Sequence, residues 1–212
     1  MKLLIIDNYD SFTHNLYQLC GQIMERKLSQ SFQKGFELQI DVFKNDEKDL
    51  EFIKNERYDK IIISPGPGSV SDDEYFGICK NVIIELGKNT PILGICLGMQ
   101  GIAYCFGGEI HRSKFKLHGK VSTIDIRKSH SSKLFYGLNT QFQAMRYHSL
   151  CVENTPAMDQ NLILSATATE SDGSITIMAL EHRIYPIYGV QFHPESYETK
   201  AGGKIINNFL NL

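Results

Sequence analysis

The first feature that could do chemistry is a cysteine between two glycines, in Gly94-Ile95-Cys96-Leu97-Gly98. An apolar run at 92–95 leads into Cys96 and a helix-like segment at 99–106 follows it, which is the arrangement of a nucleophile elbow. The glycines allow a tight turn, and the positive end of the helix favours a thiolate over a thiol. The pattern predicts a nucleophilic cysteine, although a glycine-rich turn with an inert cysteine has the same sequence.

A base for this thiol stands near the other end of the chain, where His193-Pro194-Glu195 directly follows the last apolar strand. Residues two apart in an extended chain project to the same side, so we expect the Glu195 carboxylate beside the His193 ring. Sites of open α/β sheets form at the carboxyl ends of parallel strands. If the strands before Cys96 and His193 are parallel neighbours, a Cys-His-Glu triad forms, with His193 as base and later acid and Glu195 fixing its tautomer.

A third element, Ser64-Pro65-Gly66-Pro67-Gly68, follows an apolar run at 61–63 and is expected at the same edge of the sheet. The prolines fix φ and the glycines leave main-chain amides accessible. The loop is therefore suited to presenting N–H donors to an oxyanion, while a plain Pro/Gly turn is the alternative interpretation.

The elements that must position these residues alternate between strand-like and helix-like segments over the first half of the chain. The buried-strand runs are 3–6, 61–63 and 92–95, and the helix-like segments are 11–23, 46–56 and 72–86. Continuous apolar runs suit strands buried on both faces. The alternation predicts the α/β class, with an open, mostly parallel doubly wound sheet.

After Gly107-Gly108 the pattern changes to short alternating segments that contain Ser and Thr, which predict an added antiparallel strand region. These segments are 120–126, 141–152, 161–169 and 174–181. A strand at 187–192 and a helix at 199–210 follow, and residues 24–38 are interpreted as a helix extension and a surface loop. No repeat or long linker interrupts the pattern, so a single domain over 1–212 is expected.

The composition excludes several classes of function. The chain has 22 Lys and Arg against 24 Asp and Glu, so its charge favours neither nucleic acid nor an acidic membrane surface as a partner. No apolar run approaches a membrane span, and Asp7 interrupts the N-terminal apolar stretch before a signal-peptide core forms, so a cytoplasmic location is expected. The five cysteines form no CxxC pair, and we expect neither a metal nor a cofactor.

Six ordered motifs make the chain resemble the class I, triad-type glutamine amidotransferases, and within them the glutaminase subunits of anthranilate synthase and aminodeoxychorismate synthase. The motifs are 4–12 (LIIDNYDSF), 62–68 (IISPGPG), 91–100 (PILGICLGMQ), 118–120 (HGK), 146–150 (RYHSL) and 189–196 (GVQFHPES). They span nearly the whole chain. The resemblance implies the flavodoxin-like fold of this family and hydrolysis of L-glutamine to glutamate and ammonia.

The resemblance also implies a role for each matching residue. Cys96 corresponds to the nucleophile of the family, and His193 and Glu195 complete its triad. The residues implied to hold glutamine and its oxyanion are Gly66, Pro67, Gly68, Leu97, Gln100, Ser149 and Leu150. Without the resemblance, Ser149 would be interpreted as an ordinary strand hydroxyl.

Ammonia is useful only if it reaches an acceptor before bulk water protonates it. A chain of this length holds no synthase domain, so the resemblance implies that the partner in a hetero-oligomer is a separate, chorismate-using synthase subunit. Asn8, Tyr9 and His118 are candidate contacts, because they lie in loops at or near the rim of the Cys96 site. The tryptophan and folate branches share all six motifs, so the acceptor stays open.

Three alternatives compete with this interpretation. One is an amidotransferase subunit for another acceptor, and a second is a γ-glutamyl hydrolase or cysteine peptidase on the same elbow. The loop at 64–68 and the motif at 146–150 argue against the second. The third is a non-catalytic binding module that kept the fold, which the presence of all three triad positions disfavours.

Overall fold

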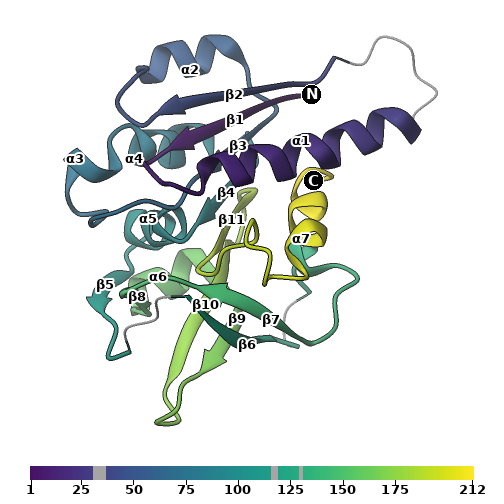
Figure 1. Ribbon diagram of the computed structural model, residues 1–212. Helices are drawn as coiled ribbons and strands as arrows, with labels where there is room; N and C mark the ends of the chain where they lie inside the picture. Colours follow the sequence, from purple (N-terminus) through teal and green to yellow (C-terminus); the bar gives the residue numbers. More distant parts are fainter. Residues whose placement is uncertain (31–36, 116–118, 129–130) are drawn as a thin grey trace.

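A nine-stranded sheet runs through the middle of the molecule (Figure 1). The computed structural model describes residues 1–30, 37–115, 119–128 and 131–212. In order across the sheet, the strands are β2 (Gln39–Lys44), β1 (Lys2–Asp7), β3 (Lys60–Ile63), β4 (Ile92–Ile95), β11 (Ile187–Val190), β10 (Ile175–His182), β9 (Leu162–Thr169), β6 (Lys120–Ile126) and β7 (Gln141–Arg146).

The sheet has a parallel half and an antiparallel half. Neighbouring strands from β2 to β11 are parallel, and those from β11 to β7 are antiparallel. The predicted α/β sheet with an added antiparallel region is therefore confirmed. A second, two-stranded antiparallel sheet consists of β5 (Glu109–Arg112) and β8 (Leu150–Glu153).

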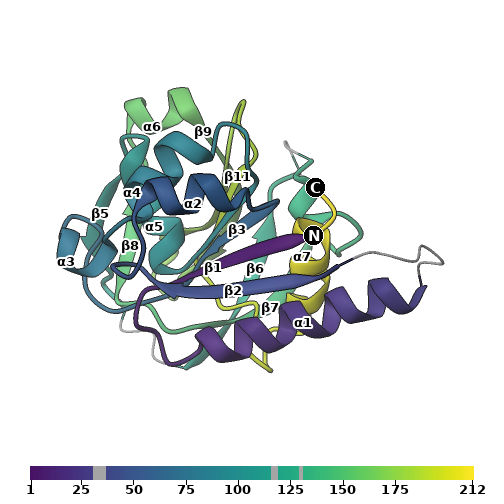
Figure 2. The same cartoon turned by 90° about the horizontal axis from the view of Figure 1, so that it is seen from above.

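Helices cover both faces of the parallel half. The helices among the described residues are α1 (Thr13–Gln30), α2 (Leu50–Glu56), α3 (Asp73–Phe76), α4 (Cys79–Asn81), the π-helical η1 (Val82–Leu86), α5 (Leu97–Cys105), the 3-10 helix η2 (Lys133–Phe135), α6 (Pro156–Asn161) and α7 (Gly202–Phe209). Figure 2 shows α1 and α7 on one face and α2, α4 and α5 on the other. Within the described residues, no helix has the length and apolarity needed to cross a membrane.

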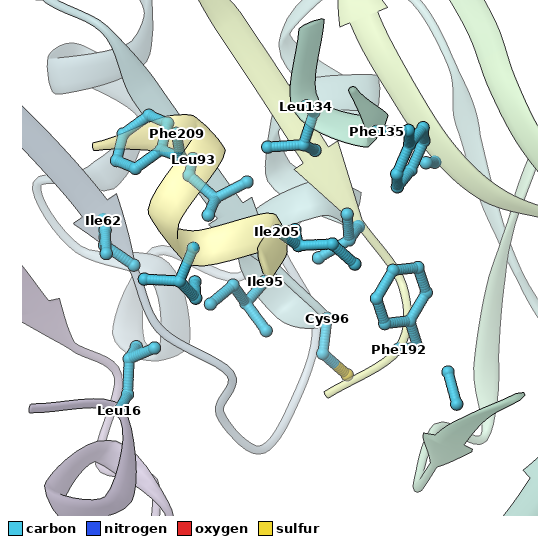
Figure 3. Close-up of a cluster of buried hydrophobic side chains, with 14 of the residues drawn as sticks. Leu16, Ile62, Leu93, Ile95, Cys96, Leu134, Phe135, Phe192, Ile205 and Phe209 are labelled. Carbon is cyan, nitrogen blue, oxygen red and sulfur yellow. The ribbon is translucent and has the colours of Figure 1, made fainter. Parts of the chain in front are cut away.

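The apolar runs are buried on both faces, as their composition predicts. Alternate residues of β1 enter different clusters: Leu3 and Ile5 pack on the α1 and α7 side, and Leu4 and Ile6 on the opposite side. Burying one such side chain contributes about 1.5–3 kcal/mol to folding. The labelled aliphatic and aromatic members of the first cluster in Figure 3 are Leu16, Ile62, Leu93, Ile95, Leu134, Phe135, Phe192, Ile205 and Phe209.

The prediction of one helix over 72–86 is wrong, because the chain breaks into α3, α4 and η1. Gly77 has a φ of +43°, a region that glycine adopts readily, and its N–H donates to the Asp73 carbonyl at 2.8 Å. The next N–H, of Ile78, donates to the Asn45 carbonyl at 2.9 Å. The segment is thus tied to the loop after β2 and cannot continue as one helix.

The prediction of one strand over 141–152 is also wrong. β7 ends at Arg146, β8 begins at Leu150, and β8 pairs with β5 in the second sheet. The buried Arg146 side chain turns toward Glu170 of the loop after β9, and the His148 ring bonds to the Leu150 carbonyl at 2.8 Å. These two contacts hold the intervening residues in a turn.

Other boundaries shift for identifiable reasons. The helix expected from 46 begins only at Leu50, because the Asp49 side chain caps it by accepting from the Phe52 N–H at 2.8 Å. The chain also contains β2, β5 and α6, which the apolar pattern does not predict. The helix extension expected within 24–38 is confirmed by α1, which continues to Gln30, and the expected loop lies partly outside the described residues.

Candidate active site

Cys96 occupies a strained turn between β4 and α5. Its φ is +52°, a region that a residue with a side chain rarely adopts and that costs about 1–3 kcal/mol. A Cβ on Gly94 would come within 2.4 Å of the Gly98 carbonyl carbon, and one on Gly98 within 2.5 Å of the Ile63 carbonyl oxygen. Both glycines are therefore required for the close approach of the turn to the sheet.

The strands before Cys96 and His193 are parallel neighbours, which is the condition that the sequence analysis sets for a Cys-His-Glu triad. Ile95 of β4 pairs with Val190 of β11 in parallel register, so both chains leave the sheet at the same edge. The His193 main-chain N–H then donates to the Met145 carbonyl of β7 at 3.0 Å, which fixes its position beyond the strand end.

His193 and Glu195 form a buried pair. The His193 Nδ1–H donates to Glu195 Oε1 at 2.6 Å, and the side chains are only 4% and 1% exposed. The contact expected from the spacing of these residues is confirmed. His193 Nε2 and Glu195 Oε2 make no hydrogen bond to any described residue, so Nε2 is available to exchange a proton with a thiol.

The surroundings of His193 favour its protonated form. Burial lowers the pKa of His193, but the Cys96 side chain and the Glu195 carboxylate outweigh this and raise it to about 10. Phe12 and Tyr147 enclose the ring: their centroids lie 6.1 Å and 5.0 Å from that of His193, both edge-on. The site can therefore hold an imidazolium next to the sulfur and shield it from water.

Gln191 is a residue of the site to which the sequence analysis gives no role. Its side-chain Nε2 donates to Cys96 Sγ at 3.5 Å, and its Oε1 accepts from Gln100 Nε2 at 3.1 Å. Gln100 Nε2 also donates to the Leu150 carbonyl at 3.2 Å. The signal in the sequence that could have identified Gln191 is its position, because it directly follows β11 as Cys96 directly follows β4.

The Pro/Gly loop after β3 lies against the elbow. A Cβ on Gly66 would meet Leu97 Cδ2 at 3.0 Å and the Asn8 carbonyl oxygen at 2.6 Å. Gly68 has a φ of +78°, and a Cβ there would collide with the Tyr75 ring. The main-chain N–H groups of Gly68 and Leu97 donate to no described residue. Both are therefore free to donate to an external acceptor.

A pocket of about 550 Å³ extends from this loop to the second sheet. It is lined by Gly68, Ser69, Asp72, Tyr75, Ile110, Arg112, Ser113, Ser149 and Leu150. The structure thus brings Gly68, Ser149 and Leu150 together around one pocket. Gln100 does not line the pocket, but its side chain donates to the carbonyl of the lining residue Leu150. Cys96 is not among the lining residues, and Pro67 lies on the loop between Gly66 and Gly68.

The three candidate partner contacts differ in their surroundings. Asn8 is only 1% exposed and bonds to Ser64 and Asn45, so its side chain serves the loop after β3 and is not presented at the surface. Tyr9 is 50% exposed, and its hydroxyl bonds to Asp46. His118 lies outside the described residues.

Comparison with protein-family models matches residues 4–212 to the family described as glutamine amidotransferase class-I. An anthranilate synthase component 2 of Leptospira biflexa is 48% identical, with all of both chains aligned. One of Saccharolobus solfataricus is 44% identical over 98% of this chain and 97% of the relative. The bifunctional protein TrpGD of Thermotoga maritima is 42% identical, and the match covers all of this chain and 32% of that one.

A solved structure supports the fold. The crystal structure of a protein from Thermoplasma acidophilum, described as a subunit of GMP synthase, superimposes with a TM-score of 0.77, covering all of this chain and 92% of the other. The two sequences are 24% identical, so the likeness concerns the fold alone.

Proposed function

The chain belongs to the class I glutamine amidotransferase family, and we propose that it is the glutaminase subunit of an anthranilate synthase. In this role it hydrolyses L-glutamine at Cys96 and delivers ammonia to a partner subunit that aminates chorismate. The observation that carries the proposal is the buried His193–Glu195 pair at 2.6 Å next to the Cys96 side chain, with Nε2 of His193 making no hydrogen bond within the described part of the chain.

The proposed reaction is acyl transfer through a thioester. The Cys96 thiolate attacks the carboxamide carbon of glutamine, and the carbonyl oxygen becomes an oxyanion facing the N–H groups of Leu97 and Gly68. His193 donates its proton to the departing amide nitrogen, so the C–N bond breaks and ammonia leaves. His193 then takes a proton from water, whose oxygen attacks the glutamyl thioester and releases glutamate and the thiolate.

The pocket beside the loop offers both charges that a free amino acid needs. Arg112 can pair with the α-carboxylate and Asp72 with the α-ammonium group, because both line the same space as Ser149 and Leu150. The Gln100 Nε2 hydrogens are used by Leu150 and Gln191, which leaves Gln100 Oε1 as the group able to accept from a substrate N–H. We infer that glutamine lies with its amide toward Cys96.

The relatives favour the tryptophan branch over the folate branch. The reported relatives at 44% and 48% identity over nearly their full lengths are both anthranilate synthase components. We therefore propose that the partner is the chorismate-using subunit of anthranilate synthase, and the corresponding subunit of aminodeoxychorismate synthase becomes the second one to test.

The experiment is anthranilate fluorescence in a mixture of this chain, the large anthranilate synthase subunit of the same organism, chorismate and glutamine. We expect fluorescence that disappears with Cys96→Ser and returns when an ammonium salt replaces glutamine. Absence of fluorescence with glutamine, while the same partner works with ammonium, would assign this chain to another acceptor. Turnover of peptide or γ-glutamyl peptide substrates at a rate comparable to glutamine would instead favour a hydrolase or peptidase.

A further inference from the structure

The buried amide of Gln191 contacts the reacting sulfur but takes no part in the mechanism above. Its side chain is completely buried, and Nε2 lies 3.5 Å from Cys96 Sγ. The amide is carried on the first residue after β11, directly beside the elbow that follows β4. The backbone holds it as well, because the Gln191 N–H donates to the Met178 carbonyl at 2.9 Å.

The hydrogen-bond pattern decides which end of this amide faces the sulfur. The Leu150 carbonyl can only accept, so Gln100 must present its NH₂ group there, at 3.2 Å. The same Gln100 nitrogen lies 3.1 Å from Gln191 Oε1, so that atom must be the carbonyl oxygen of Gln191. The NH₂ group of Gln191 is then directed at Cys96 Sγ, and the contact is a donated hydrogen bond.

A second set of hydrogen bonds, through Arg146 and His148, also reaches the Leu150 carbonyl. Arg146 can only donate, and its Nε bonds to His148 Nε2 at 3.0 Å, so the His148 proton lies on Nδ1 and is donated to the Leu150 carbonyl at 2.8 Å. Glu170 balances the Arg146 charge at 2.7 Å. Burial and the Arg146 charge lower the pKa of His148 to about 4, so His148 is neutral near pH 7 and keeps this orientation.

We propose that Gln191 is a catalytic residue whose amide stabilises the Cys96 thiolate by a hydrogen bond, with Gln100 and His148 as the residues that position it. The inference rests on the proposed role of Cys96 as the nucleophile. A hydrogen bond to a charged acceptor is stronger than one to a neutral acceptor, so the amide favours the thiolate over the thiol. Gln191 does this without exchanging a proton.

The test is the pH dependence of Cys96 alkylation by iodoacetamide in the full chain, measured by mass spectrometry of the Cys96 peptide. Gln191→Met keeps the size of the side chain but removes the donor. We expect the pH of half-maximal rate to rise by about one unit and the rate at pH 7 to fall about tenfold. Gln191→Glu turns an acceptor toward the sulfur, so its shift is expected to be larger than that of Gln191→Met.

Asn208→Leu is the matched control, since Asn208 is a buried amide that bonds to the Leu134 and Tyr136 carbonyls away from the elbow. It should lower the melting temperature but leave the alkylation profile of Cys96 unchanged. Wild-type profiles in both Gln191 variants, in protein that melts cooperatively, would overturn the proposal. The readout needs no glutamine turnover, so this outcome is distinct from a failure of the proposed function, which would appear as ammonia release by Cys96→Ser.

Discussion

The main-chain N–H of Cys96 donates a 2.8 Å hydrogen bond to the carbonyl of Val190, the last residue of β11. His193 follows three residues later, so one backbone contact joins the elbow to the segment that carries its base. The separation of thiol and imidazole is therefore set by two adjacent parallel strands, which hold side chains more rigidly than loops do. The same bond helps to hold Cys96 at its positive φ.

Replacing Glu195 tests whether the buried carboxylate orients His193. In Glu195→Gln the amide oxygen can still accept the Nδ1–H, but the NH₂ group can instead donate to an unprotonated Nδ1, which permits the wrong tautomer of His193. We expect kcat for glutamine hydrolysis to fall by about 100-fold or more, with little change in KM, because general acid–base catalysis contributes roughly 10²–10⁴-fold. Glu198→Gln, an exposed carboxylate three residues away, is the control and should behave as wild type. A Glu195→Gln enzyme with wild-type kcat would show that the pair is structural.

The protonation state of His193 provides a second prediction. Burial lowers its pKa, whereas Cys96 and Glu195 raise it to about 10, so His193 should remain protonated through neutral pH. In Cys96→Ser one raising group is lost while burial stays, and the pKa should fall. Nitrogen chemical shifts of the imidazole across a pH titration measure this directly. The idea fails if His193 titrates at the same pH in both proteins.

The sequence predicts local geometry better than it predicts contacts between distant segments. The contact between His193 and Glu195 follows from two residues in an extended chain, and the strands before Cys96 and His193 follow from the apolar runs. Both are local patterns. The break at Gly77 and the turn after Arg146 depend on partners far away in the sequence, Asn45 and Glu170. A local sequence pattern carries no information about such long-range contacts. For the same reason, the sequence does not predict the contact between Gln191 and Cys96.

Gly101 is another position whose role depends on a residue distant in the sequence, and it gives a third prediction. Glycine inside α5 costs about 1 kcal/mol relative to alanine, yet a Cβ there would meet Cζ of the buried Phe76 ring at 1.9 Å. We expect Gly101→Ala to lower the free energy of unfolding by about 1–3 kcal/mol, measured in urea, because overpacking exceeds the gain in helix propensity. Gly21→Ala in α1 is the control: its nearest atom is 4.0 Å away, and the change should stabilise the protein by about 0.5–1 kcal/mol.

A double-mutant cycle separates the clash at Gly101 from other effects. Phe76→Leu removes the ring atoms that the new Cβ would meet, so Gly101→Ala should cost less in that background than in the wild type. Equal costs in the two backgrounds would show that the Phe76 contact is not the reason for the glycine.

The buried His148 gives a fourth prediction, on stability in acid. Its pKa is lowered to about 4, first by burial and then by the Arg146 charge, while the unfolded chain titrates near pH 6.5. The unfolded state therefore binds the proton first as the pH falls. The stability that His148 contributes is complete above about pH 6.5 and is lost as the pH falls toward 4.

The shift corresponds to a loss of about 3 kcal/mol for this one group, at 1.36 kcal/mol per pKa unit. His148→Gln removes the titration, so its free energy of unfolding should depend less steeply on pH in this window than that of the wild type. Glu170 and His193, the other titratable groups that act on His148 besides Arg146, remain in both proteins, and the difference between the two curves isolates His148. Parallel curves from urea unfolding between pH 7 and pH 4 would mean that folding does not lower the pKa of His148, and the buried neutral ring donating to Leu150 would be wrong.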